Sequence, residues 1–100
     1  DKPFLYYSKA PDLVTLFDGR VAEKPVKARY DWPQAGIIEF CNEAPRSFGQ
    51  IRGELNDRKG EHAYDDAAVT RALDGLRLKR ILYEEKGRYL TLALPVNQSF

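Results

Sequence analysis

The sequence predicts a single α+β domain built from two strands, three helices and a terminal β-hairpin, in that order. Stretches near both ends alternate apolar with polar residues, as strands do, and the stretch between them repeats its apolar residues every three or four positions. With 100 residues, 43% of them hydrophobic, the chain is large enough for one core. We expect the domain over residues 12–95, an N-terminal connector over 1–11 and a tail over 96–100.

The predicted strands follow an aromatic opening, DKPFLYYSKA, which lacks a clear period and which we expect to lie against the domain as the connector. LVTLF contains β-branched and aromatic residues, and Asp18-Gly19 after it predicts a hairpin turn because glycine accepts a positive φ. VAEK returns from the turn, and VKARY, residues 26–30, alternates apolar with basic side chains as a half-buried strand does. Together they predict a strand–turn–strand unit.

The period changes in DWPQAGIIEFCNEAP, which predicts the first helix. Asp31 can cap this helix, and Pro33 suits its first turn, where no amide donor is needed. The apolar face repeats every three residues and has a second row beside it: Trp32, Ala35, Ile38 and Cys41, with Ile37, Phe40 and Ala44. Pro45 ends the helix.

Two more helices are predicted from their caps and apolar stripes. Ser47 and Gln50 form a capping box, and the short helix that they begin is lined by Phe48, Ile51 and Leu55. The polar stretch NDRKGEH then predicts a loop. Asp65 and Asp66 open the third helix, whose buried stripe is Val69, Ala72, Leu73 and Leu76.

The last predicted element is a hairpin, ILYEEKGRYLTLALP, whose two strands turn at Lys86-Gly87. Its second strand has two rows of side chains that point to opposite sides: Leu90, Leu92 and Leu94 in one, and Tyr89, Thr91 and Ala93 in the other. A small sheet of this kind can close a core over three helical stripes. We therefore expect a winged-helix-like arrangement.

Composition and charge exclude several classes of protein. The net charge is only +1, whereas nucleic-acid modules usually concentrate uncompensated Lys and Arg on one face. No apolar run approaches the roughly 20 residues of a membrane span, and no secretory signal opens the chain. The lone Cys41 fits a reducing compartment, so we expect a cytoplasmic, soluble domain without membrane contact. The absence of Met and the start at Asp1 favour an excised piece of a longer protein.

The sequence offers no catalytic constellation. One His and one Cys cannot build an ordinary zinc site. Cys41 lies on the apolar helix face and is interpreted as a core thiol, and His62, in the polar loop, as a surface residue. The adjacent carboxylates at 65–66 and 84–85 point apart, and no glycine-rich phosphate loop is present. We expect no catalytic residue, no metal and no cofactor in this chain.

DNA binding is the first alternative function, because winged helices often read DNA. The loop from about Asn56 to Tyr64 is longer than the tight turn of about 3–4 residues in a helix-turn-helix. The third helix begins with Asp65 and Asp66, which phosphates would repel, where a recognition helix reads bases. Nucleic acid is therefore not the expected partner. A protein–protein interaction module, with an exposed face that dimerises, is the second alternative.

The stretch ALDGLRLKRILYEEKGRYLTLALP, residues 72–95, resembles the C-terminal end of radical SAM enzymes that mature ribosomally made peptide natural products. The shared features are a Leu-rich helix, a basic residue, a Leu-Tyr pair, a Gly turn and a Tyr-Leu-x-Leu-Ala-Leu strand, here at Leu73 and Leu76, Arg80, Leu82-Tyr83, Gly87 and Tyr89 to Leu94. Residues 16–51 are similar to the family's hairpin, acid-capped helix and C-x-x-x-P-R-S/T linker, at Cys41, Pro45, Arg46 and Ser47. The resemblance covers roughly residues 12–95.

The resemblance implies a non-catalytic C-terminal accessory domain, since the family's cysteine trio for the iron–sulfur cluster is missing here. Many such enzymes are C-methyltransferases, so the parent protein would hold an iron–sulfur cluster, S-adenosylmethionine and cobalamin. The strand-then-three-helix order also looks like the domains that hold leader peptides in such pathways. The implied partners are the rest of the parent enzyme and a precursor peptide.

A shallow basic groove is the predicted peptide-binding site. Lys27 and Arg29 are the outward residues of a strand whose free edge can pair with an extended peptide. On the third helix, Ala68, Arg71 and Gly75 form a low surface with one basic side chain. The simpler interpretation is that Gly75 makes room for the terminal hairpin, which is the wing of a winged helix. Lys27 and Arg29 would then only keep a sheet edge from aggregating.

Overall fold

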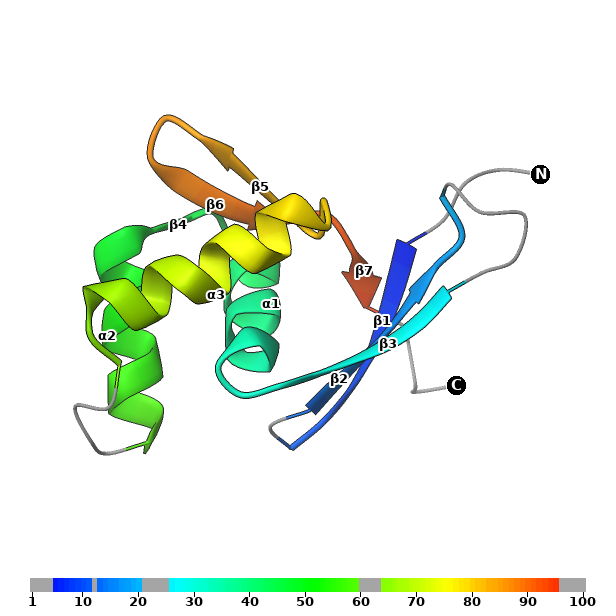
Figure 1. Ribbon diagram of the computed structural model, residues 1–100, viewed down its shortest axis with the longest axis horizontal. Helices are drawn as coiled ribbons and strands as arrows, with labels where there is room; N and C mark the ends of the chain where they lie inside the picture. Colours follow the sequence, from blue (N-terminus) through cyan, green and yellow to red (C-terminus); the bar gives the residue numbers. More distant parts are fainter. Residues whose placement is uncertain (1–4, 12, 21–25, 60–63, 96–100) are drawn as a thin grey trace.

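The structure is a computed structural model that describes residues 5–11, 13–20, 26–59 and 64–95. It is a small α+β domain of two sheets and three helices (Figure 1). In chain order the elements are β1 (Leu5–Ala10), β2 (Leu13–Asp18), β3 (Val26–Asp31), α1 (Gln34–Glu43), β4 (Arg46–Ser47), α2 (Phe48–Lys59), α3 (Asp66–Leu78), β5 (Leu82–Glu85), β6 (Arg88–Thr91) and β7 (Leu94–Pro95).

The larger sheet has the strand order β3-β2-β1-β7. Its first three strands are antiparallel, and β7 runs parallel to β1. The helices cover only one face of this sheet (Figure 1). The side chains on that face are buried at Tyr7, Val14 and Leu16, and they alternate with more exposed neighbours along β1 and β2.

The smaller sheet has the order β4-β6-β5 and contains the terminal hairpin. Lys86 and Gly87 form its tip with φ angles of 55° and 78°, the two positive values that a two-residue hairpin turn of the primed type requires. The amide of Gly87 donates to the Glu84 carboxylate at 2.9 Å. After β6 the chain crosses to the larger sheet as β7, so one segment joins the two sheets.

Local capping signals begin two of the helices, as the sequence predicts. The Ser47 amide donates to Gln50 Oε1 at 2.9 Å, and the Gln50 amide donates back to Ser47 Oγ at 3.2 Å, which completes the capping box of α2. The Asp65 carboxylate accepts from the Ala68 amide and caps α3. The end of α3 is closed by Arg80, with φ of 59°, and by a bond from the amide of Ile81 to the carbonyl of Leu76.

The predicted cap of α1 is wrong. Asp31 is the last residue of β3, and the N-cap position belongs to Pro33, without a side-chain hydrogen bond to the helix. Burial stabilises this helix instead, since α1 packs against both sheets and against α2 and α3. The Trp32 ring lies directly against Gly36, where an added Cβ would stand 2.5 Å from the ring.

One core surrounds α1 and receives side chains from every helix and from both sheets. Its largest fully buried side chains are Ile37, Ile38, Ile51, Leu55, Leu73, Leu76, Ile81, Val14, Val69 and Cys41. The prediction that Cys41 is a core thiol is therefore confirmed. Thr91 is buried as well, and its hydroxyl donates to the carbonyl of Ile38 at 2.8 Å. No helix in the described part of the chain is long and apolar enough to cross a membrane.

The structure corrects two sequence expectations about the first strands. Residues 5–10, expected in the connector, form β1 between β2 and β7. Asp18 pairs with Val26, so residues 19–25 connect the strands and there is no two-residue turn at Asp18-Gly19. The expected strand VAEK lies outside the described residues, as do the connector's first residues, His62 and the tail.

The expected single strand at the end of the hairpin is divided between β6 and β7, which belong to different sheets. Its two rows point to opposite sides as predicted, and the structure shows which row is inside. Leu90, Leu92 and Leu94 are the exposed row, whereas Thr91 and Ala93 are buried. The inner positions lie against helix α1, where small side chains fit.

Candidate functional site

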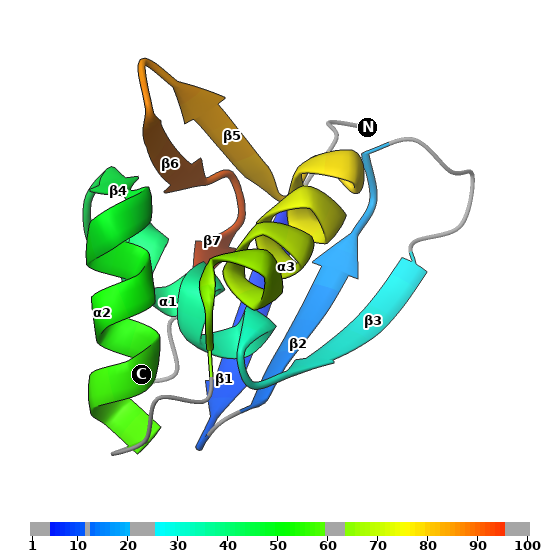
Figure 2. The same cartoon turned by 60° about the vertical axis from the view of Figure 1, so that its left-hand side comes forward.

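The candidate site begins with β3, the edge strand of the larger sheet. Only one side of β3 is hydrogen-bonded to a neighbour among the described strands, namely β2. In an edge strand, alternate residues direct their N–H and C=O groups away from the sheet. The backbone of β3 can therefore accept another extended strand. Figure 2 shows β3 at the rim of the sheet, with β2 between it and β1.

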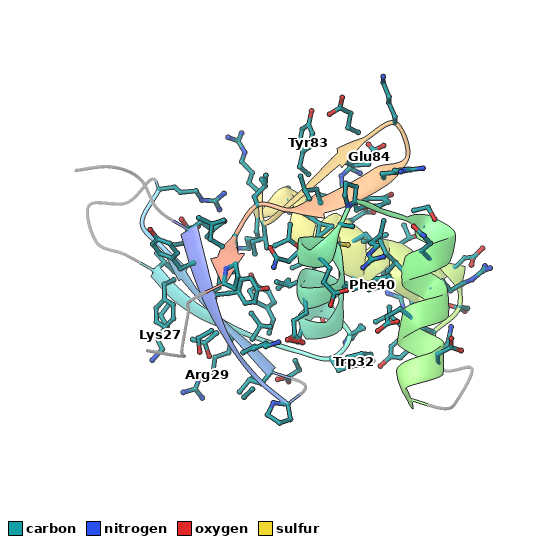
Figure 3. The ribbon with its side chains drawn as sticks, turned by 180° about the vertical axis from the view of Figure 1, so that it is seen from behind. Lys27, Arg29, Trp32, Phe40, Tyr83 and Glu84 are labelled. Carbon is teal, nitrogen blue, oxygen red and sulfur yellow. The ribbon has the colours of Figure 1, made fainter. Side chains whose placement is uncertain are left out.

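Lys27 and Arg29 project from the face of β3 that the helices do not cover. Their partners on β2 are Phe17 and Thr15, whereas the intervening Ala28 pairs with the buried Leu16. Figure 3 shows both basic side chains pointing away from the helices. The Lys27 ammonium lies 6.0 Å from the centroid of the Phe17 ring.

The opposite face of β3 is directed toward the helices. Val26, Ala28 and Tyr30 lie on this face, and Val26 at the start of the strand is 55% exposed. Tyr30 packs partly into the core, and this burial raises the pKa of its hydroxyl. An exposed apolar side chain at a free strand edge can be covered by a further strand that pairs with that edge.

Helix α3 presents its small residues on the side away from α2 and the hairpin. Arg77 faces Glu84 of β5 at 3.7 Å, and Asp66 pairs with Arg52 of α2 at 2.6 Å, so these residues mark one side of α3. At 100° per residue, Ala68 and Gly75 fall on the other side. A Cβ added at Gly75 would have no described heavy atom within 4 Å.

The open space at Gly75 contradicts the idea that this glycine makes room for the wing. Neither hairpin strand lies within contact distance of it among the described residues. Gly75 is instead an exposed residue with a low profile inside a helix, where glycine is unfavourable relative to alanine. Arg71 is also exposed and lies further round the outer surface of α3.

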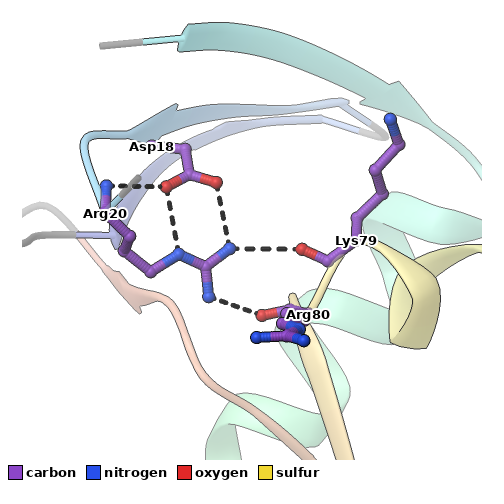
Figure 4. Close-up of polar contacts among 4 residues, drawn as sticks. All are labelled: Asp18, Arg20, Lys79 and Arg80. Atoms are coloured by element: carbon purple, nitrogen blue, oxygen red, sulfur yellow. Dashed lines mark hydrogen bonds and ion pairs between the residues drawn. The ribbon is translucent and has the colours of Figure 1, made fainter. Parts of the chain in front are cut away.

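Arg20 fixes the position of α3 relative to the sheet (Figure 4). Its guanidinium donates to both oxygens of Asp18, at 3.0 Å from Nε and 2.9 Å from Nη2. The same group donates to the carbonyls of Arg80 at 2.6 Å and Lys79 at 3.2 Å, at the end of α3. The hydrogen bonds from Arg20 lower the pKa of the Asp18 carboxyl. Asp18 is the last residue of β2 and pairs with Val26, the first residue of β3. Arg20 therefore holds the end of α3 against β2, the strand next to β3.

Sequence reasoning missed Arg20, although Asp18 two residues before it is a visible carboxylate partner. Its other partners are backbone carbonyls about sixty residues away, and a carbonyl has no signature in a sequence. The last turn of a helix carries unsatisfied carbonyls that attract a cation. That general rule identifies the acceptors but not the arginine that reaches them.

The five predicted site residues do not form the walls of one groove. Lys27 and Arg29 occupy the face of the larger sheet that the helices do not cover, whereas Ala68 and Gly75 belong to α3, on the covered side of that sheet. We define the β3–α3 site as the free edge of β3, with Val26 on its helix-facing side, and the Ala68 and Gly75 side of α3. Lys27 and Arg29 flank this site from the outer face of β3.

A hollow lies between α2 and the start of α3, and its polar side chains stabilise the fold. Its volume is about 580 Å³. The Asn56 amide closes the loop by donating to the carbonyl of Tyr64 and accepting from its amide. The ion pair between Arg52 and Asp66 occupies the same region. Every polar side chain named here has a partner within the fold.

The described residues contain no group of three or more His, Cys, Asp or Glu side chains that could hold a metal ion. Burial raises the pKa of the Cys41 thiol to about 12, so it stays protonated at neutral pH. Glu84, the one carboxylate of the hairpin pair that is partly buried, is engaged by the Gly87 amide and Arg77.

No protein-family model, curated protein or solved structure matches this chain. The chemistry of the site is therefore inferred from its own residues.

Proposed function

We propose that this chain is a non-catalytic accessory domain that binds a peptide for a radical SAM enzyme of ribosomal-peptide maturation. The observation that carries the peptide-binding part is the free edge of β3. An extended peptide that pairs with such an edge gains backbone hydrogen bonds, and pockets for alternate side chains give selectivity. The domain would hold the peptide while the parent enzyme carries out the chemistry.

A winged-helix-like arrangement supports this proposal. The elements α1, β4, α2, α3, β5 and β6 follow one another, and the short β4 pairs with β6 to give a three-stranded sheet. The hairpin of β5 and β6 is the wing of this arrangement. In front of it, β1 to β3 add a sheet whose edge is not used by the winged helix itself. That additional sheet is the part that differs from a minimal winged helix.

The link to radical SAM enzymes rests on the resemblance of residues 72–95, which form the end of α3, the wing and β7. The parent enzyme would supply the iron–sulfur cluster, S-adenosylmethionine and cobalamin, with C-methylation as the reaction. The gene that encodes the parent protein tests this link directly. We expect a Cys-x-x-x-Cys-x-x-Cys motif upstream of Asp1, and its absence would remove the radical SAM part of the proposal.

The peptide-binding part is tested by NMR titration of the ¹⁵N-labelled chain with the precursor peptide encoded beside the parent gene. We expect chemical-shift changes along residues 26–31 and on the Ala68–Gly75 side of α3. Shift changes confined to the wing, with these two segments unchanged, would contradict binding at the β3–α3 site even if the peptide bound.

DNA binding remains the second candidate function because the winged-helix-like arrangement leaves the outer surface of α3 exposed. That surface includes the exposed carboxylates Asp66 and Asp74, which would repel phosphates. A titration with duplex DNA separates the two functions. Binding that weakens steeply with salt and shifts residues of α3 and the wing would favour DNA.

A further inference from the structure

The two faces of β3 carry different chemistry, which specifies the peptide further. We propose that the β3–α3 site selects an acidic, alternating segment. Carboxylate side chains would lie beside Lys27 and Arg29, and the alternate residues, beside Val26 and Ala28 on the helix-covered face, would be apolar. This inference rests on the proposed function, because it describes the sequence of the peptide that pairs with β3.

The outer face of β3 presents two cations without a described counter-charge. The cross-strand neighbours of Lys27 and Arg29 are the uncharged Phe17 and Thr15. Among the described residues, no carboxylate lies within 4.0 Å of either cation, whereas Arg20, Arg46 and Arg52 each have such a partner. A peptide strand paired with β3 would place its outer-face side chains about 4.5–5.5 Å away from these cations, measured between Cβ atoms. Carboxylates fit these positions.

Asp31 limits the acidic preference to two positions. It lies on the same outer face as Lys27 and Arg29, at the other end of the strand, and it is exposed. A peptide carboxylate placed opposite Asp31 would meet a like charge, which is unfavourable between directly opposed residues. The favourable positions for carboxylates are therefore those beside Lys27 and Arg29, and a peptide strand that ends before Asp31 avoids this repulsion.

The helix-facing side of the site requires an apolar side chain. Val26 is 55% exposed there, and its strand neighbour Asp18 is tied through Arg20 to the last turn of α3. Gly75 lies one turn before that tie and leaves open space on its side of the helix. A peptide side chain next to Val26 would lie on the helix-covered side of the sheet and would cover the exposed apolar surface of Val26.

The period of a strand makes the two preferences depend on each other. Successive side chains point to opposite faces, so a shift by one residue exchanges the faces of the whole segment. The shifted peptide would direct its carboxylates toward Val26 and α3 and its apolar residues toward Lys27 and Arg29. A peptide with the same composition but without the alternation cannot satisfy both faces in any register. Alternation therefore distinguishes this site from general attraction between a basic surface and an acidic peptide.

The test compares two decapeptides of identical composition, both with five glutamates and five valines. In one the two residues alternate, and in the other the glutamates precede the valines. Fluorescence anisotropy with the 100-residue chain measures affinity, and NMR shifts of the labelled chain locate the contact. We expect the alternating peptide to bind at least about tenfold more tightly. Equal affinity of the two peptides for β3 would overturn the inference.

Charge reversal on the outer face supplies the second arm. We expect K27E/R29E to weaken binding of the alternating Glu peptide at least about tenfold and to gain binding of an alternating Lys–Val peptide. The matched control is K86E/R88E at the wing tip, which is distant from the site and should keep the original preference. The gain with the Lys peptide shows that the variant is folded. An equal loss in the control variant would contradict a role for Lys27 and Arg29.

The helix-facing side is tested by Gly75→Leu, which fills the open space at this position of α3. We expect weaker binding of the alternating peptide, with Thr70→Leu on the wing side of α3 as the control. Equal effects of the two variants would overturn the apolar assignment.

Failure of the proposed function would give a different result. If neither decapeptide nor the precursor peptide shifts residues 26–31, the β3 edge binds no peptide, whereas shifts there without preference contradict only the alternation.

Discussion

At the scale of single residues, the fold depends on Arg20 more than its place in the sequence indicates. Four hydrogen bonds connect its guanidinium to Asp18 and to the carbonyls at the end of α3. The Arg20 and Asp18 side chains are only 24% and 27% exposed, so these charged groups are partly withdrawn from water. This one residue joins the larger sheet to the helix that completes the candidate site.

Arg20→Ala is expected to lower the free energy of unfolding by about 1–3 kcal/mol, because hydrogen bonds to charged groups are among the stronger ones. The matched control is Arg52→Ala, which removes a pair whose side chains are 48% and 69% exposed. Such exposed pairs contribute about 0–1 kcal/mol. Urea unfolding of both variants measures the difference. A loss for Arg20→Ala no larger than for the control would contradict the account.

The same pair predicts a dependence of stability on pH. Hydrogen bonds from Arg20 lower the pKa of Asp18 below its ordinary value of 3.8. A carboxyl with a lowered folded-state pKa stabilises the fold above its unfolded pKa and loses that contribution as the pH falls through the folded value. We therefore expect Asp18→Asn to flatten the loss of stability below about pH 4. If the original chain and Asp18→Asn lost stability equally as the pH fell, Asp18 would make no pH-dependent contribution to stability.

At the scale of elements, the sequence predicts a feature well where its cause is local. The capping box of α2, the Asp65 cap and the stripe of α3 each depend on residues within one or two turns, and the structure contains all three. β4 could not be predicted, because its two residues form a strand only by pairing with β6, forty residues later. The alternation of VKARY was correctly identified as a strand pattern.

The error in the predicted groove also belongs to this scale. Val26 and Ala28 alternate with Lys27 and Arg29, and a strand directs alternate residues to opposite faces. That period already implies that the two cations cannot share a wall with residues of a helix packed on the apolar face. The free edge of β3, in contrast, depends on the strand order of the sheet, which no local pattern in the sequence shows.

Two glycines in helices are expected to respond to the same substitution in opposite ways. In Gly36→Ala the new Cβ would stand 2.5 Å from the Trp32 ring, so the ring must move and the fold loses stability by about 1–3 kcal/mol. In Gly75→Ala the Cβ enters open space, and better helix propensity raises stability by about 0.5–1 kcal/mol. Thermal unfolding of both variants measures the signs. Destabilisation by Gly75→Ala would show that its side of α3 is already occupied.

At the scale of the whole molecule, the chain closes on itself. β1 and β7 pair in parallel although they come from opposite parts of the chain, and α1 lies between the two sheets in a core that both share. The main partner of β1 is nevertheless local, because β1 pairs with β2 along its whole length, and residues 5–10 were left as a connector because they lack a clear apolar–polar period. The pairing of β1 with β7, some ninety residues later in the chain, has no signal in a linear pattern.

A shared core implies that the two sheets unfold together. The single Trp, Trp32, reports on the junction between β3 and α1, and far-ultraviolet circular dichroism reports on all helices. We expect urea transitions followed by the two probes to coincide, as they do for small two-state domains. An earlier fluorescence transition would show that β1 to β3 separate from the helices as an independent unit.

The central claim is that the free edge of β3 holds an extended peptide, and intermolecular nuclear Overhauser effects test it most directly. A labelled chain with unlabelled precursor peptide allows contacts between the two backbones to be observed selectively. We predict contacts from peptide Hα and amide protons to the backbone of residues 26–31, with a peptide side chain near Gly75. Intermolecular contacts found only on the wing or on the outer surface of α3, with none to the β3 backbone, would contradict the account.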